Sequence, residues 1–117
     1  MKQLDIRKYI FDINEAYELL LQFTAGKTLS DYSADPMLRS AVERQFEVIG
    51  EALGQTLHLD PSLSSRISNT GRIIAFRNRL IHGYASIADE IVRGILEANL
   101  PTLKEEVATL MRELNKE

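Results

Sequence analysis

The chain has 117 residues, a net charge of −3 and no cysteine. A single domain spanning residues 1–117 fits this length, and the lack of cysteine excludes disulfides and thiolate metal sites. Acidic residues interrupt the N-terminal positive charges and no long apolar run follows. Neither a secretory signal nor a membrane span therefore fits, and the cytoplasm is the expected compartment.

Apolar residues in the first half of the chain recur at intervals of three and four, which is the spacing of amphipathic helices. The first predicted helix covers residues 4–24 and is followed by a connector or a single turn over residues 28–33. Asp35 and Pro36 have the pattern of an N-cap followed by proline at the first helical position. They predict the start of a second long helix, which extends to about Leu57.

Gly50 lies inside this second predicted helix, where glycine costs roughly 1 kcal/mol relative to alanine. We therefore expect another backbone to approach closely at that position. A loop is predicted over residues 58–65. The apolar spacing then predicts a third helix, clearest over residues 71–82, with Gly83 as its left-handed C-terminal cap.

A fourth helix is predicted to start at Ser86 or Asp89, since both residue types cap helices well. Its apolar pattern continues to residue 114 and contains Pro101, which is expected to kink the helix or divide it in two. No stretch alternates as a strand would. The sequence therefore predicts an all-α fold, an antiparallel bundle of four or five helices.

Charge is distributed unevenly along the chain. Residues 1–60 carry a balance of −4 and residues 89–117 one of −3, whereas residues 61–88 hold four arginines and no carboxylate. These are Arg66, Arg72, Arg77 and Arg79. Guanidinium groups match phosphate oxygens in a bidentate way, so this segment is a candidate surface for RNA. The alternative is a solvated basic helix that its acidic neighbours balance, and Arg66 in particular could be only a solvated loop charge.

The segment 76–84 concentrates polar chemistry at the end of the third predicted helix. It contains Arg77, Asn78, Arg79, His82 and Tyr84. Arg77 precedes His82 by five residues, so the two side chains would diverge by about 140° on an ideal helix. That divergence is smaller if His82 is the last helical residue or lies just beyond.

Histidine can accept and donate protons near neutral pH, and arginine can bind a phosphate and offset its developing charge. His82 and Arg77 would suffice for RNA cleavage without a metal ion or other cofactor. Two alternatives remain open. His82 could be only a helix cap that stabilises the helix dipole. Arg77 could instead pair within the bundle with an acidic stripe of the second helix, made up of Glu43, Glu47 and Glu51. Glu51 as a second proton carrier is a weaker possibility.

The spacing of Arg77, His82 and Tyr84 resembles the Arg-x4-His-x-Tyr signature of the HepT branch of the HEPN superfamily. The run from Leu38 to Ala52, which includes Glu-Val-Ile-Gly-Glu-Ala, resembles the second helix of that family, and the opening run from Asp5 to Ile10 resembles its first. The resemblance extends over nearly the whole chain and reinforces the prediction of a HEPN-like helical domain.

This resemblance implies a toxin of a type II-like toxin–antitoxin module, active as a metal-independent endoribonuclease. It implies a homodimer with paired active sites in an interfacial cleft, where Arg77 and His82 are catalytic. The implied partner is a nucleotidyltransferase antitoxin of the MntA type, which transfers AMP to Tyr84. The added charge and bulk would keep RNA out of the cleft. Tyr84 as an ordinary packing residue is the alternative.

Three further residues of the basic segment are assigned supporting roles. Arg72 and Arg79 are expected to guide RNA, and Asn78 occupies a position that is often polar in the superfamily. A dimer has independent support, because one histidine offers no obvious second proton carrier for the leaving oxygen and a two-fold axis would pair the sites. Two other functions remain open: a non-catalytic helical partner and AMP acceptor for the nucleotidyltransferase, and a plain helical dimerisation domain.

Overall fold

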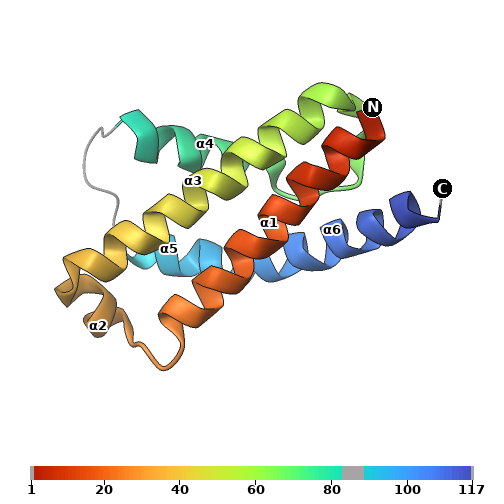
Figure 1. The fold of residues 1–117 in the computed structure, drawn as a ribbon. Coiled ribbons are helices and arrows are strands. Elements are labelled where there is room, and N and C mark those ends of the chain that lie inside the picture. The colour runs from red at the N-terminus through yellow and green to blue at the C-terminus, as the bar shows by residue number, and fades with distance from the viewer. Residues whose placement is uncertain (1, 83–88, 117) are drawn as a thin grey trace.

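The computed structural model describes residues 2–82 and 89–116, and every regular element among them is helical. In chain order these are α1 (Lys2–Thr24), α2 (Leu29–Ala34), α3 (Pro36–Leu59), the 3-10 helix η1 (Pro61–Ser65), α4 (Thr70–His82), α5 (Asp89–Gly94), the π-helical turn η2 (Ile95–Asn99) and α6 (Leu100–Asn115). Figure 1 shows α1 and α3 as a long antiparallel pair, with α4 returning along α3 and α6 lying along α1. The predicted all-α antiparallel bundle is confirmed.

The starts of α2 and α3 follow from local side-chain hydrogen bonds. Thr28 caps α2 by accepting a bond of 3.0 Å from the Asp31 backbone N–H, and Asp31 accepts one of 2.9 Å from the Thr28 N–H. This reciprocal capping box satisfies two donors that a helix start leaves free. Asp35 accepts from the Leu38 N–H at 3.1 Å and Pro36 follows it, as the sequence predicts for the start of α3.

The prediction of a loop over residues 58–65 is wrong. The second helix continues to Leu59, and residues 61–65 form η1. Asp60 stabilises this compact turn, because its carboxylate accepts hydrogen bonds from the Ser62 N–H at 3.2 Å and from the Ser62 hydroxyl at 2.6 Å. Pro61 suits the first position of η1, since no N–H is needed there. Thus a residue that sequence reasoning placed inside a loop caps a turn.

Pro101 divides the last helix, one of the two predicted outcomes. Proline has no N–H to donate to the carbonyl four residues back, and its ring crowds that carbonyl. The backbone therefore widens into η2 just before it, where the Leu100 N–H donates to Ile95 O, five residues earlier. A regular α-helix, α6, then resumes and contains Pro101 in its first turn.

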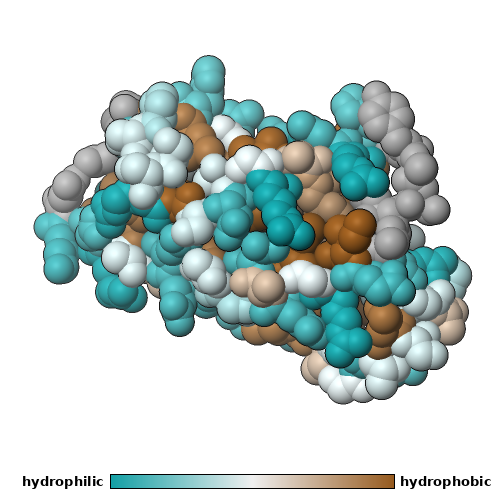
Figure 2. All heavy atoms as spheres, turned by 180° about the vertical axis from the view of Figure 1, so that it is seen from behind, coloured by the Kyte–Doolittle hydropathy of each residue, from teal (hydrophilic) through white to brown (hydrophobic). Residues whose placement is uncertain are grey.

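The buried hydrophobic side chains form one core between the helices, and most predicted apolar positions belong to it. Its best-buried large side chains are Ile10, Ile13, Leu20, Val42, Phe46, Ile49, Leu53, Ile73, Ile95, Leu100, Leu103 and Val107. Leu21, Ile81 and Ile91 continue the apolar pattern but are 43%, 46% and 40% exposed. From behind, hydrophilic residues cover most of the surface, and apolar ones show between them (Figure 2). Among the described helices, none is both long and apolar enough to cross a membrane.

Candidate active site

Five of the predicted site residues, Arg72, Arg77, Asn78, Arg79 and His82, lie on α4, and His82 is its last residue. Tyr84, the predicted site of modification, lies outside the described residues, as do Gly83 and Ser86. The helix is fixed to α3 through its buried face. There the ring of Phe76 meets that of Phe46 edge-to-face, with centroids 5.1 Å apart. Phe76 directly precedes Arg77 in sequence, so its contact with Phe46 sets the position of the arginine relative to α3.

Arg77 is held at the edge of the α3–α4 contact with its side chain 28% exposed. Its Nη2 donates to Glu51 Oε2 at 2.6 Å, and its Nη1 donates to Asn78 Oδ1 at 3.0 Å. The Nε atom is buried and has no hydrogen-bond partner among the described residues. Of the three carboxylates considered for the acidic stripe, Glu51 is the one that pairs with Arg77. Asn78 supports the same guanidinium group, so the arginine is already positioned within one chain.

Gly50 makes this placement possible. A Cβ built on Gly50 would lie 2.3 Å from the Cβ of Arg77 and 2.6 Å from its Cγ. Such distances are far shorter than any van der Waals contact, so no larger residue fits unless α3 and α4 separate. The sequence predicts a close approach at this glycine, and the structure shows that the atoms nearest to it are the Cβ and Cγ of Arg77.

A hollow of about 320 Å³ lies beside Arg77 between α1, α3 and α4. Its lining consists of Lys8, Tyr9, Asp12, Arg44, Glu47, Val48, Glu51, Ala52, Arg77 and Ile81. Three ion pairs border it: Lys8–Asp12 at 3.3 Å, Arg44–Glu47 at 3.5 Å and the Arg77–Glu51 pair. Each of the three cations that line the hollow is thus already paired with a carboxylate, and an anion that entered would have to compete with these carboxylates.

Lys8 and Arg44 also line this hollow, and nothing in the sequence pattern predicts a role for either. Each lies on a different helix from Arg77, separated from it by dozens of residues. Their helical spacing shows only that they are near the edge of an apolar stripe. Which edges meet depends on the packing of α1 against α3, which the sequence pattern does not specify.

The arginines of the basic segment separate into two classes. Arg72 and Arg79 are exposed, lie two turns apart on α4 and have no ion-pair partner in the part of the chain that the structure describes. Arg66 instead binds Glu113 of α6 through two bonds, of 3.1 Å and 2.6 Å, and this pairing keeps the pKa of Glu113 below its usual value. Arg66 therefore connects η1 to the end of α6 and is not a simple solvated charge.

His82 is exposed at the end of α4, whereas Arg77 faces α3. Since both residues are helical, their five-residue separation directs them to different sides of α4. Glu51 and Asn78 accept hydrogen bonds from the Arg77 guanidinium in the part of the chain that the structure describes. Within residues 2–82 and 89–116, no group of three or more His, Cys, Asp or Glu residues is arranged to hold a metal ion.

Comparison with known proteins decides the family. The model of the family described as "Ribonuclease HepT-like" matches residues 13–110, which include α3 and α4 with the candidate site. The chain belongs to the HepT-like family. No solved structure gives a significant match.

Three archaeal proteins are among the relatives of the chain, and the chain covers most of the length of two of them. "Putative RNase MJ1380" of Methanocaldococcus jannaschii is 28% identical over 109 residues, covering 92% of this chain and 97% of that protein. "Probable ribonuclease HepT" of Thermococcus cleftensis is 29% identical over 102 residues, covering 84% and 88%. "Gamma-glutamylcyclotransferase and putative RNase MJ0434" of M. jannaschii is 30% identical over 112 residues, and the chain spans only 50% of its length.

Proposed function

We propose that this HepT-like protein is a metal-independent endoribonuclease in which Arg77 and His82 carry out the reaction. The main support for this proposal is the surroundings of the Arg77 side chain. Its guanidinium is fixed beside a solvent-open hollow by Glu51 and Asn78, and its buried Nε lacks a partner among the described residues. A positioned cation of this kind suits a phosphate whose negative charge increases during reaction.

The proposed reaction is an attack within the RNA chain. His82 takes the proton from a ribose 2′-hydroxyl, and the 2′-oxygen forms a bond to the adjacent phosphorus. The bond from phosphorus to the 5′-oxygen breaks, and that oxygen takes up a proton. The products are a 2′,3′-cyclic phosphate and a 5′-hydroxyl. Arg77 stabilises the additional charge on the phosphate oxygens, and Arg72 and Arg79 bind neighbouring phosphates of the strand.

A homodimer would bring an Arg77 and a His82 side chain together in one site. Within one chain Arg77 and His82 leave α4 on different sides, so a two-fold contact is a direct way to bring one copy's imidazole to the other copy's guanidinium. Ile81 supports this proposal, because it is 46% exposed and lines the same hollow as Arg77. The second His82 would also supply the proton that the leaving 5′-oxygen requires. We propose the cytoplasm as the compartment in which this dimer would act on cellular RNA.

We further propose that the protein is the toxin of a two-component module and that a MntA-type nucleotidyltransferase is its antitoxin. The Tyr84 phenolic oxygen would attack the α-phosphorus of ATP, pyrophosphate would leave, and the phenolic proton would pass to solvent. The chain would gain an adenylate two residues after His82. Negative charge at that position would oppose the binding of RNA phosphate.

The product ends test the proposed function. Purified protein is incubated with a labelled RNA in excess EDTA, and the fragments are analysed by mass spectrometry. We expect internal cleavage that leaves 2′,3′-cyclic phosphate and 5′-hydroxyl ends. Fragments with 5′-phosphates, or cleavage that requires added Mg²⁺, would contradict the mechanism. Tight binding to the nucleotidyltransferase without any RNA cleavage would favour the non-catalytic interpretation.

Replacing Glu51 by glutamine is expected to strengthen RNA binding. The change removes a negative charge 2.6 Å from the Arg77 guanidinium, where it competes with the incoming phosphate. We expect the KM for RNA to fall about threefold, with the larger effect at low salt. Steady-state cleavage at two salt concentrations measures this effect.

Glu47→Gln is the matched control, because Glu47 lies one turn earlier on α3 and pairs with Arg44 at 3.5 Å. Its effect on KM should be smaller. A large drop in kcat for Glu51→Gln with KM unchanged would contradict the competition argument. Such a result would favour Glu51 as a proton carrier.

A further inference from the structure

The hollow beside Arg77 contains an aromatic side chain that the proposed reaction does not use. Tyr9 of α1 lines it, is half-buried and packs against the hydrophobic core. The Lys8 ammonium lies over its ring, with Nζ 5.3 Å from the ring centroid. The Lys8 side chain is 70% exposed, so this ring face is covered in part by a long, solvated side chain that can move aside. A planar ligand can then take its place on the ring.

Two of the three cations in this hollow are held only loosely by their carboxylates. Lys8 meets Asp12 at 3.3 Å and Arg44 meets Glu47 at 3.5 Å, and the two cationic side chains are 70% and 69% exposed. Exposed ion pairs of this kind contribute little to stability. Lys8 and Arg44 can therefore exchange a carboxylate for a phosphate at small cost, whereas Arg77 is held at 2.6 Å by its own carboxylate partner.

The interior of the hollow suits an uncharged, planar group. Its three carboxylates balance its three cations, so neither sign of charge dominates. Val48 and Ala52 add apolar surface to the lining. An RNA base is uncharged and planar, and unpaired bases stack on aromatic side chains whatever their identity. Aromatic rings beside cations that bind phosphate are the usual means of holding single-stranded RNA.

We propose that this hollow is a nucleotide subsite, in which a base next to the cleaved phosphate stacks on the Tyr9 ring and Arg44 binds a neighbouring phosphate. Lys8 leaves the ring as the base arrives and joins Arg44 at the strand. The subsite rests on the proposed ribonuclease function, because Arg77 in the same hollow is the group that binds the cleaved phosphate. A base that is paired within a duplex cannot stack there, so the enzyme is expected to prefer single strands.

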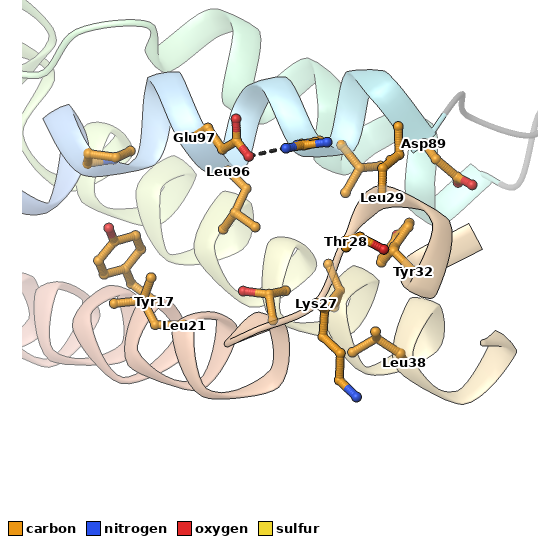
Figure 3. A pocket seen from close by; sticks show the side chains of 15 residues that line it. Tyr17, Leu21, Lys27, Thr28, Leu29, Tyr32, Leu38, Asp89, Leu96 and Glu97 are labelled. Carbon is orange, nitrogen blue, oxygen red and sulfur yellow. Dashed lines mark hydrogen bonds and ion pairs between the residues drawn. The ribbon is translucent and has the colours of Figure 1, made fainter. Parts of the chain in front are cut away.

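A second tyrosine of α1 provides a matched control. Tyr17 lies about two turns after Tyr9, is also half-buried, and has the Lys104 ammonium 5.7 Å from its ring centroid. It lines a separate cavity of about 340 Å³, where Figure 3 shows it together with Leu21 and Leu96. That cavity has no residue in common with the hollow, so the ring and the ammonium recur there without the catalytic arginine.

The test measures binding of a short single-stranded RNA whose 2′-hydroxyls are methylated, so that the proposed cleavage cannot occur. Fluorescence anisotropy with the purified full chain gives the Kd, and circular dichroism verifies the fold of each variant. We expect Tyr9→Leu to weaken binding about fivefold to 100-fold, the range for a lost base stack, and Tyr9→Phe and Tyr17→Leu to leave the Kd unchanged. A strand without bases should bind the unaltered chain more weakly. That loss should be smaller in Tyr9→Leu by the same factor, which a merely structural role of Tyr9 would not produce.

Arg44→Gln tests the phosphate contact through its dependence on salt. We expect the steepness of log Kd against log salt concentration to fall by about 0.7, the value for one phosphate contact on a single strand. Lys104→Gln should leave the steepness unchanged. Equal Kd values for Tyr9→Leu and Tyr17→Leu, in a chain that cleaves RNA, would overturn the subsite and leave the ribonuclease function standing. If the unaltered chain neither binds nor cleaves RNA, the proposed function is wrong and the subsite is overturned with it.

Discussion

Replacing His82 by alanine is expected to lower the rate of RNA cleavage by about 100-fold to 10,000-fold, the range that a positioned general base contributes. His82 is an exposed residue at the end of α4 and is absent from the core, so the change should leave the fold intact. The rate is measured under single-turnover conditions with enzyme in excess, so that RNA affinity does not obscure the chemical step.

The chain supplies its own control for this experiment. His58 is the other histidine, is also exposed, and lies in the last turn of α3. Its replacement by alanine should leave the cleavage rate unchanged. If His82→Ala cleaves as fast as the unaltered protein while His58→Ala does not, the assignment of the base is wrong. If both variants remain fully active, the ribonuclease mechanism proposed for α4 has no support.

The sequence predicted most of the helical framework because its determinants are local. The Asp35–Pro36 start of α3 depends on residues within a few positions of one another. So do the turn after Thr28 and the division at Pro101, each of which was one of two outcomes that the sequence left open. The end of α3 was less predictable. His58 and Leu59 remain helical because Asp60 and Pro61 begin a new turn, a signal similar to Asp35–Pro36 that the loop interpretation overlooked.

The charge environment of the site could be predicted only in part, because its pairings are long-range. Arg66 and Arg77 belong to the same basic stretch as Arg72 and Arg79, but they meet Glu113 and Glu51 respectively. Those partners lie 47 and 26 residues away in sequence. A count of charges along the chain therefore overestimates the unpaired positive charge of residues 61–88. Arg72 and Arg79 are the arginines of this stretch without an ion pair among the described residues, and the proposed attraction of RNA depends mainly on them.

Replacing Gly50 by alanine is expected to destabilise the protein, although alanine is the better helix former. Alanine alone would favour the helix by about 0.5–1 kcal/mol. The new methyl group, however, would lie 2.3 Å from the Cβ of Arg77, and that atom is fixed by the α4 backbone. The two helices must then separate, which disturbs the Phe46–Phe76 contact beneath and costs about 1–3 kcal/mol.

Gly54→Ala isolates this effect, because Gly54 lies one turn later on α3 and a Cβ there meets nothing within 4 Å. Urea unfolding should show Gly54→Ala to be more stable than the unaltered chain by about 0.5–1 kcal/mol. Gly50→Ala should be less stable than the unaltered chain and should also cleave RNA more slowly, since Arg77 moves with α4. Equal changes in the two variants would mean that the helices tolerate a methyl group between them. In that case the stem of Arg77 could not be what requires glycine at position 50, and the placement of the guanidinium beside Glu51 would need another cause.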